Sequence, residues 1–398
     1  MRLLRCSAAV FAAAALVFAV IGVRTAAQSA APAATASGLL RSEASLMGHT
    51  LAIAYAPELK ADDRSYQALV SSATPAAERR VRVGEFALNG GTLRIGGVDL
   101  PKAEAPGRLY DVSIEGTSEG WTLRLADRSS TDVAPVAVTL ERKSRAARAR
   151  TFAAALVPTA ADSGQLLVSW GDYDATTPLK FVDPPVKPLR ANAENGLPNV
   201  GVKRGNRDDT SAKSRAQFLS LNCETVVGLP NGKRVVASFI RSVSSDAAAE
   251  NPRLRRVVGR GLNAGGTDYE KLAATTSGTI VELTESQVPR LTIDTPVRIG
   301  NLTLRTENQV GGFPGVYGMW LKRVGDGWHL VFNQEYDVWG TQHDQKFDVG
   351  EIELAHADQV PATQPFTIAL VPSGADRGQL NIVWGAHRWT ADFVVAGR

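Results

Sequence analysis

The chain has 398 residues, of which 44% are hydrophobic and 21% charged, and its 44 Lys and Arg residues nearly balance its 40 Asp and Glu residues. This composition is typical of a folded globular protein and excludes a low-complexity chain or a strongly basic nucleic-acid-binding chain. The length is sufficient for two domains with separate cores.

Residues 1–27 have the pattern of a bacterial Sec-type signal peptide. Arg2 and Arg5 form a basic start, residues 8–23 are an apolar run, and small residues lead to a predicted cleavage after Ala27. An uncleaved anchor is the alternative, but the apolar run is somewhat short for a membrane span. We therefore expect a secreted or periplasmic protein with no transmembrane segment after cleavage.

Cleavage also changes the charge balance, because it removes three Arg residues and no acid. The mature chain has 41 basic and 40 acidic residues, so a nucleic-acid partner is not expected. Cys223 is its only cysteine, which excludes an intramolecular disulfide. That cysteine lies beside Glu224 in an alternating strand pattern, and we interpret it as a packing residue rather than a catalytic thiol.

In chain order, residues 28–38 form a flexible tether and residues 39–183 show short alternating segments with frequent turns, which predict a β-sandwich. Within it, residues 45–55 predict a hairpin and residues 58–70 a short helix. Residues 184–217 contain four prolines and no apolar periodicity, and so predict an exposed interdomain linker.

The remainder, residues 218–398, predicts a second sandwich with a short helix at residues 267–274. We therefore expect an all-β protein made of two homologous antiparallel β-sandwich domains, with one or two short helices each.

One stretch of the chain occurs twice and is the basis for expecting a duplication. Residues 155–171 recur as residues 369–385 without a gap. Each copy predicts a β-hairpin, because its apolar side chains alternate with period two. Trp170 and Trp384 are the last apolar residues on the repeated face of each copy. We interpret them as core anchors, with stacking on a ligand as the alternative.

The second copy resembles a bacterial secreted family catalogued as domain of unknown function 2911. The resemblance rests on Gly-Val-Tyr-Gly-Met at 315–319, Gly-Trp-His-Leu-Val-Phe-Asn at 327–333, Trp-Gly-Thr-Gln-His-Asp at 339–344, and the hairpin that ends at Trp384. His343 stands where the family usually has Tyr. A Trp-Arg-Thr-Gly-x-Asn-Glu stretch common in the family is missing from both 73–88 and 262–281. The resemblance implies a β-rich exported protein and implies no reaction.

Residues that bear chemistry are few. The five histidines show no His-x-His or His-Glu-x-x-His spacing, and no catalytic, cofactor-binding or metal-binding set is predicted. His343, Asp344 and Asp348 cluster on a loop at 333–349 that is longer than its first-half counterpart, and a hydrated loop is the simpler interpretation. Neighbouring acids such as Glu351 with Glu353 are a weak signal for a glycosidase, which needs two carboxyl groups flanking a cleft.

Aromatic and planar side chains near the ends of the predicted strands give a further indication of binding. The residues singled out for ligand binding are Trp339, His343, Asp344, Asp348, His387 and Trp389.

Our preferred hypothesis is that the protein is a non-enzymatic binding or structural module of the cell envelope, with an unknown envelope protein or glycan as its partner. The alternative is a hydrolase, or a metal- or glycan-binding site, on the 333–349 loop. A third possibility is that the two domains pack together as one rigid unit. The first two can be distinguished by whether His343, Asp344, Asp348 and His387 converge in one pocket.

Overall fold

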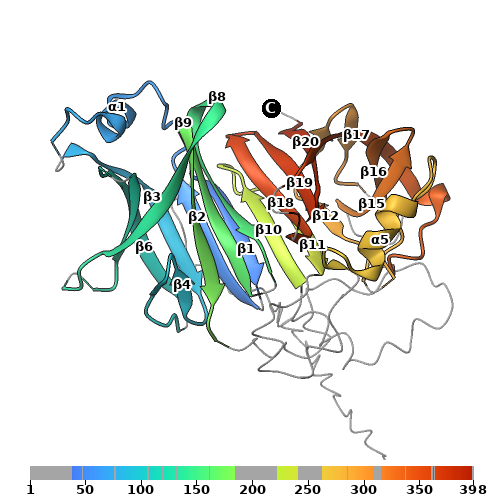
Figure 1. Ribbon diagram of the computed structural model, residues 1–398, viewed down its shortest axis with the longest axis horizontal. Coiled ribbons are helices and arrows are strands. Elements are labelled where there is room, and N and C mark those ends of the chain that lie inside the picture. Colours follow the sequence, from blue (N-terminus) through green and yellow to red (C-terminus); the bar gives the residue numbers. More distant parts are fainter. Residues whose placement is uncertain are drawn as a thin grey trace, which may run out of the picture.

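The computed structural model (Figure 1) describes residues 38–183, 222–240 and 262–396, except for positions 47, 76–77, 105–106, 119, 131, 161, 285, 308–314, 337, 360–361 and 363. Strands joined by antiparallel pairing make up most of these residues, so the predicted all-β class is confirmed. We refer to residues 38–183 as the first half and to residues 222–396 as the second half.

Among its described residues, the first half contains nine strands and one helix. They are β1 (Leu40–Leu46), β2 (His49–Tyr55), α1 (Arg64–Val70), β3 (Arg80–Asn89), β4 (Leu93–Ile95), β5 (Val98–Asp99), β6 (Arg108–Gly116), β7 (Trp121–Asp127), β8 (Val136–Pro158) and β9 (Ser163–Phe181).

The second half contains eleven strands, one α-helix and one 3₁₀ turn among the residues that the structure describes. They are β10 (Asn222–Gly228), β11 (Arg234–Ile240), α5 (Thr267–Ala274), β12 (Arg290–Ile293), β13 (Val297–Ile299), β14 (Leu302–Leu304), β15 (Val316–Val324), β16 (Gly327–Asn333), the 3₁₀ turn (Gln345–Phe347), β17 (Asp348–Asp358), β18 (Gln364–Gly374), β19 (Arg377–Gly385) and β20 (His387–Val395).

Each half has two packed layers with the same order of strand pairing. One layer of the first half runs β1–β2–β3–β6–β7–β8, and the corresponding layer of the second half runs β10–β11–β12–β15–β16–β17. The facing layers contain β8, β9 and β4 in the first half, and β18, β19, β20 and β13 in the second. Rings from the two layers meet in the core, where Tyr55 lies 5.1 Å from Phe152 and Phe239 lies 6.3 Å from Phe366.

The two halves share one continuous sheet. Strand β1 pairs antiparallel with β10, with Glu43 opposite Val226, as the blue and yellow-green strands at the centre of Figure 1 show. The facing layers also approach each other through β8 and β18. The buried side chains of both halves therefore form one contiguous cluster, and the two separate cores expected from the length are not seen.

The repeated stretches have the same surroundings in the two halves. Leu156 is opposite Leu166 in the β8–β9 hairpin, and the equivalent residues of the second copy, Leu370 and Leu380, are opposite each other in β18–β19. Trp170 and Trp384 are both fully buried, as predicted for core anchors.

Each of these tryptophans also has a helix-borne tyrosine beside it. The hydroxyl of Tyr66 on α1 accepts a hydrogen bond from the Asp172 amide at 2.9 Å, and that of Tyr269 on α5 accepts one from the Ala386 amide at 3.2 Å. Gly171 and Gly385 let the tyrosines approach, because their φ angles are positive and an added Cβ would meet the tyrosine ring at 2.0 and 2.3 Å.

Other local expectations agree with the structure. The helix predicted at 267–274 is α5, the 45–55 hairpin is formed by β1 and β2, and Cys223 is fully buried. The predicted signal peptide and the proline-containing linker lie outside the described residues.

Replacing Gly385 by Ala should destabilise the protein more than the same change at Gly325. The two glycines have similar φ angles, 59° and 55°, but an added Cβ is in open space only at Gly325. We expect Gly325→Ala to cost about 1 kcal/mol from backbone strain, and Gly385→Ala to cost about 1–3 kcal/mol more because Tyr269 must move. Urea unfolding of both variants measures the difference, and equal costs would contradict the role given to Tyr269.

Candidate functional site

The loop between β16 and β17 lies over the outer face of the second half's sheet. It covers a small apolar cluster, separate from the main core, that consists of Val288, Trp320, Val331 and Val338. Trp320 is only 2% exposed, although it is on the face of β15 opposite Tyr317 and Met319. The long loop therefore has a packing role, because it buries an indole that would otherwise face solvent.

Backbone hydrogen bonds attach this loop to the segment before β12. The amide of Val288 donates to the carbonyl of Val338 at 3.0 Å, and the amide of Gly340 donates to the carbonyl of Ser286 at 2.9 Å. The Leu283 amide in turn donates to the Gly340 carbonyl at 2.9 Å. A Cβ at position 340 would lie 2.5 Å from atoms of Leu283, which explains why glycine follows Trp339 in this motif.

His343 and Asp348, two of the residues chosen from the sequence, contact each other. His343 Nε2 lies 2.9 Å from Asp348 Oδ1, and the imidazole packs edge-on against Trp320 with ring centroids 5.1 Å apart. Asn333, which is 1% exposed, donates from Nδ2 to the same Asp348 oxygen at 2.7 Å and to the Asp344 carbonyl at 3.0 Å. Asn333 was not chosen from the sequence, yet it holds the two ends of the loop together.

The remaining loop candidates also make local contacts. Asp344 Oδ1 accepts from the Lys346 amide at 3.2 Å and so caps the 3₁₀ turn, and its other oxygen pairs with Lys346 Nζ. The Trp339 amide donates to Gln342 Oε1 at 3.3 Å, and the Trp339 side chain is half-buried. These groups stabilise the loop itself.

His387 and Trp389 lie in a different part of the molecule. Trp389 is fully buried against Trp328, with ring centroids 5.5 Å apart, and His387 Nδ1 lies 3.0 Å from Nε2 of His356 on β17. Burial, and then the neighbouring His356, lower the pKa of His387.

The two groups of candidates do not converge. Asp348 and His356 are both on β17, eight residues apart, which corresponds to roughly 26 Å at the rise of a β-strand. The 333–349 loop and the β17–β20 histidines are therefore two separate places on the second half.

The acidic neighbours at 351 and 353 do not have the environment of a general acid. Glu351 accepts from Lys322 Nζ at 2.7 Å and lies 3.0 Å from His329 Nδ1. The hydrogen bond from Lys322, with a smaller contribution from His329, lowers the pKa of Glu351. A glycosidase acid needs a raised pKa instead.

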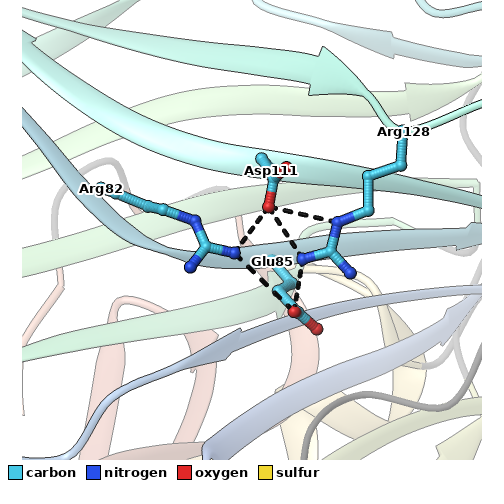
Figure 2. A network of polar contacts seen from close by, with 4 residues as sticks. All are labelled: Arg82, Glu85, Asp111 and Arg128. Atoms are coloured by element: carbon cyan, nitrogen blue, oxygen red, sulfur yellow. Dashed lines mark hydrogen bonds and ion pairs between the residues drawn. The ribbon is translucent and has the colours of Figure 1, made fainter. Parts of the chain in front are cut away.

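A polar cluster in the first half was not found from the sequence (Figure 2). Asp111 on β6 accepts from Arg82 at 2.6 Å and from Arg128 at 2.8 Å, and Arg128 also bonds Glu85, which is buried on β3. The hydrogen bond from Arg128, followed by that from Arg82, lowers the pKa of Asp111. Two positive and two negative groups cancel, so the cluster ties β3 to β6 without creating a charged binding patch.

The β3–β6 register brings Arg82 and Glu85 to Asp111, and the β6–β7 pairing brings Arg128, which follows β7, to the same place. The spacing of Arg82 and Glu85 along one strand does not reveal this. Among the described parts of the chain, no three His, Cys, Asp or Glu side chains gather in a group that could hold a metal ion. In the same parts, no helix is both long enough and apolar enough to cross a membrane.

Comparison with known proteins supports the resemblance of the second half. Residues 290–393 match the model of a family described as a protein of unknown function (DUF2911). The match spans β12 to β20 and includes both the 333–349 loop and the β17–β20 histidines. No curated protein and no solved structure matches the chain. The DUF2911 description names no activity.

Asn333→Ala should loosen the loop of the DUF2911 region. Removing the buried amide leaves Asp348 Oδ1 and the Asp344 carbonyl without this donor, so we expect a loss of about 1–3 kcal/mol in the free energy of unfolding. Lys346→Ala is the matched control: it removes an exposed ion pair of the same loop and should cost about 0.5 kcal/mol or less. Denaturant unfolding compares the two variants, and a neutral Asn333→Ala would show that this side chain does not hold the loop.

Proposed function

We propose that the protein is an exported, non-enzymatic binding or structural module of the bacterial cell envelope, built from two copies of one domain that are joined into a single unit. The export part rests on the basic, apolar and small-residue pattern of residues 1–27. The other parts rest on the contacts described above.

The duplication is supported by equivalent contacts in the two halves. Tyr66 meets Gly171 and Trp170 as Tyr269 meets Gly385 and Trp384, and the registers of the two repeated hairpins agree. The equivalent first strands of the two copies, β1 and β10, pair with each other. This strand pairing favours one rigid unit over two domains that move independently.

One observation carries the non-enzymatic proposal: the polar groups that a hydrolase on the 333–349 loop would use are engaged in holding that loop. His343 and Asp348 bond each other, and Asp344 caps the 3₁₀ turn. His387, the fourth group, lies with His356 roughly 26 Å along β17 from Asp348. A general acid–base pair must instead flank the scissile bond.

A hydrolase, or a metal- or glycan-binding site, on the 333–349 loop remains the second candidate. The His343–Asp348 pair favours it, since an imidazole oriented by a carboxylate is a common arrangement in active sites. The half-buried Trp339 on the same loop offers an aromatic ring to a sugar.

A cosedimentation assay distinguishes the two candidates. The mature protein is incubated with isolated cell envelopes, once in EDTA and once with divalent cations, and both its recovery in the pellet and the release of soluble glycan fragments are measured. We expect binding without release, and equal binding by His343→Ala/Asp344→Ala. The control variant Glu141→Ala/Lys143→Ala changes an exposed pair in the first half and should also bind normally.

Two results would contradict the proposal. Fragment release by the wild type but not by the His343→Ala/Asp344→Ala variant would establish the loop as a hydrolytic site. Absence of the wild type from the pellet would remove the envelope as its binding target.

A further inference from the structure

His356 lies near the end of β17, and His387 begins β20. The core-facing row of β17 runs through Ile352 and Leu354, which are buried, to His356, which is exposed. The core-facing row of β20 runs back from Trp389 to His387, and the register places His356 opposite Trp389. The two imidazoles therefore continue the apolar rows to the point where the interior meets solvent.

The imidazole rings are held in position by their neighbours. His387 stacks on Trp389, with centroids 5.2 Å apart and planes 21° apart, and its ring also lies 6.1 Å from that of Tyr269. His356 lies 5.8 Å from Trp389. Because Trp389 is fully buried, the stacked ring of His387 has little freedom, whereas His356 is exposed and meets Trp389 at a tilted angle. A ligand binding to both would therefore have to order only His356.

We propose that His356 and His387 bind a divalent first-row transition metal ion, with Cu²⁺ bound most tightly. Imidazole nitrogen is a preferred ligand of such ions, and Cu²⁺ is at the top of their affinity order. The two facing nitrogens, Nε2 of His356 and Nδ1 of His387, are 3.0 Å apart.

The distance between the two nitrogens can be compared with the coordination geometry of Cu²⁺. In the structure this contact is an imidazole–imidazole hydrogen bond with ring centroids 5.2 Å apart, so the rings must turn for a metal ion to replace it. Two metal–nitrogen bonds of about 2.05 Å spanning the same 3.0 Å would give a nitrogen–metal–nitrogen angle of about 94°. Square-planar or tetragonal Cu²⁺ has neighbouring ligands near 90°.

Two charged groups near the pair have opposite effects on a bound cation. Asp358 is opposite His387 in the β17–β20 register and places a negative charge on the same face, without joining the two imidazoles in a three-ligand group, while Arg323 opposes a positive charge there. Water would complete the coordination, so binding should be reversible and sensitive to chelators.

The first half provides a natural comparison. The equivalent register positions there hold Arg142 and Tyr173, with the guanidinium 4.3 Å from the ring centroid. A cation and a phenol cannot replace two imidazoles as metal ligands. The proposed site therefore belongs to the second half alone, and one ion per chain is expected.

Titration of tag-free mature protein with Cu²⁺, followed by calorimetry and electron paramagnetic resonance, tests the proposal. We expect one ion per chain and nitrogen hyperfine structure from two imidazoles. His356→Ala and His387→Ala should each weaken binding by about tenfold or more. The controls are His329→Ala and His343→Ala, which alter histidines beside Glu351 and Asp348 and should bind as the wild type does.

Circular dichroism is used to check that each variant is folded. His356→Ala gives the firmer test, because His356 is exposed and its replacement should disturb the fold less. Wild-type affinity in His356→Ala, loss of binding in His343→Ala instead, or a spectrum without two nitrogen ligands would each overturn the assignment.

Discussion

The pairing of β1 with β10 is the contact on which the arrangement of the molecule depends. Without it, each half would end its larger sheet in an open edge with unpaired backbone groups, a feature that promotes aggregation. The two edges satisfy each other, with Glu43 opposite Val226 at the centre of the paired segment. Side chains on the same strands also reach the facing layers: Ser42 Oγ accepts from the Leu156 amide at 3.0 Å, and Thr225 Oγ1 donates to the Ile368 carbonyl at 3.5 Å.

The two halves share this framework but differ in what covers it. In the second half, the 333–349 loop forms an extra layer over Trp320, and its conspicuous polar residues hold that layer in place. In the first half, the outer face of β3 and β6 carries a balanced arginine–carboxylate cluster instead. The side chains that we propose as ligands, His356 and His387, are also in the second half, where they follow the apolar residues of β17 and precede those of β20.

Local pattern was sufficient to predict much of this structure. Period-two spacing identified the repeated hairpins and the burial of Trp170 and Trp384, and the short helix expected at residues 267–274 is α5. The contact of His343 with Asp348 could be expected because only a short stretch of loop separates them.

Contacts between distant strands could not be predicted in the same way. The β1–β10 pairing, the Arg82–Asp111 contact and the His356–His387 pair depend on which strands become neighbours and in which register. A single sequence does not contain that information locally. For the same reason, the length suggested two cores, whereas the joined sheet produces one contiguous cluster.

Amide hydrogen exchange of the intact mature protein tests the central claim, that the β1–β10 pairing makes the two halves one unit. If the claim holds, the amides of Leu40–Leu46 that point toward β10, and those of Asn222–Gly228 that point toward β1, exchange as slowly as the amides of the interior strand β16. They are then exposed only when the joined sheet opens. Rapid exchange in both segments, with β16 still protected, would mean that the halves separate in solution, and the account of a single joined unit would be wrong.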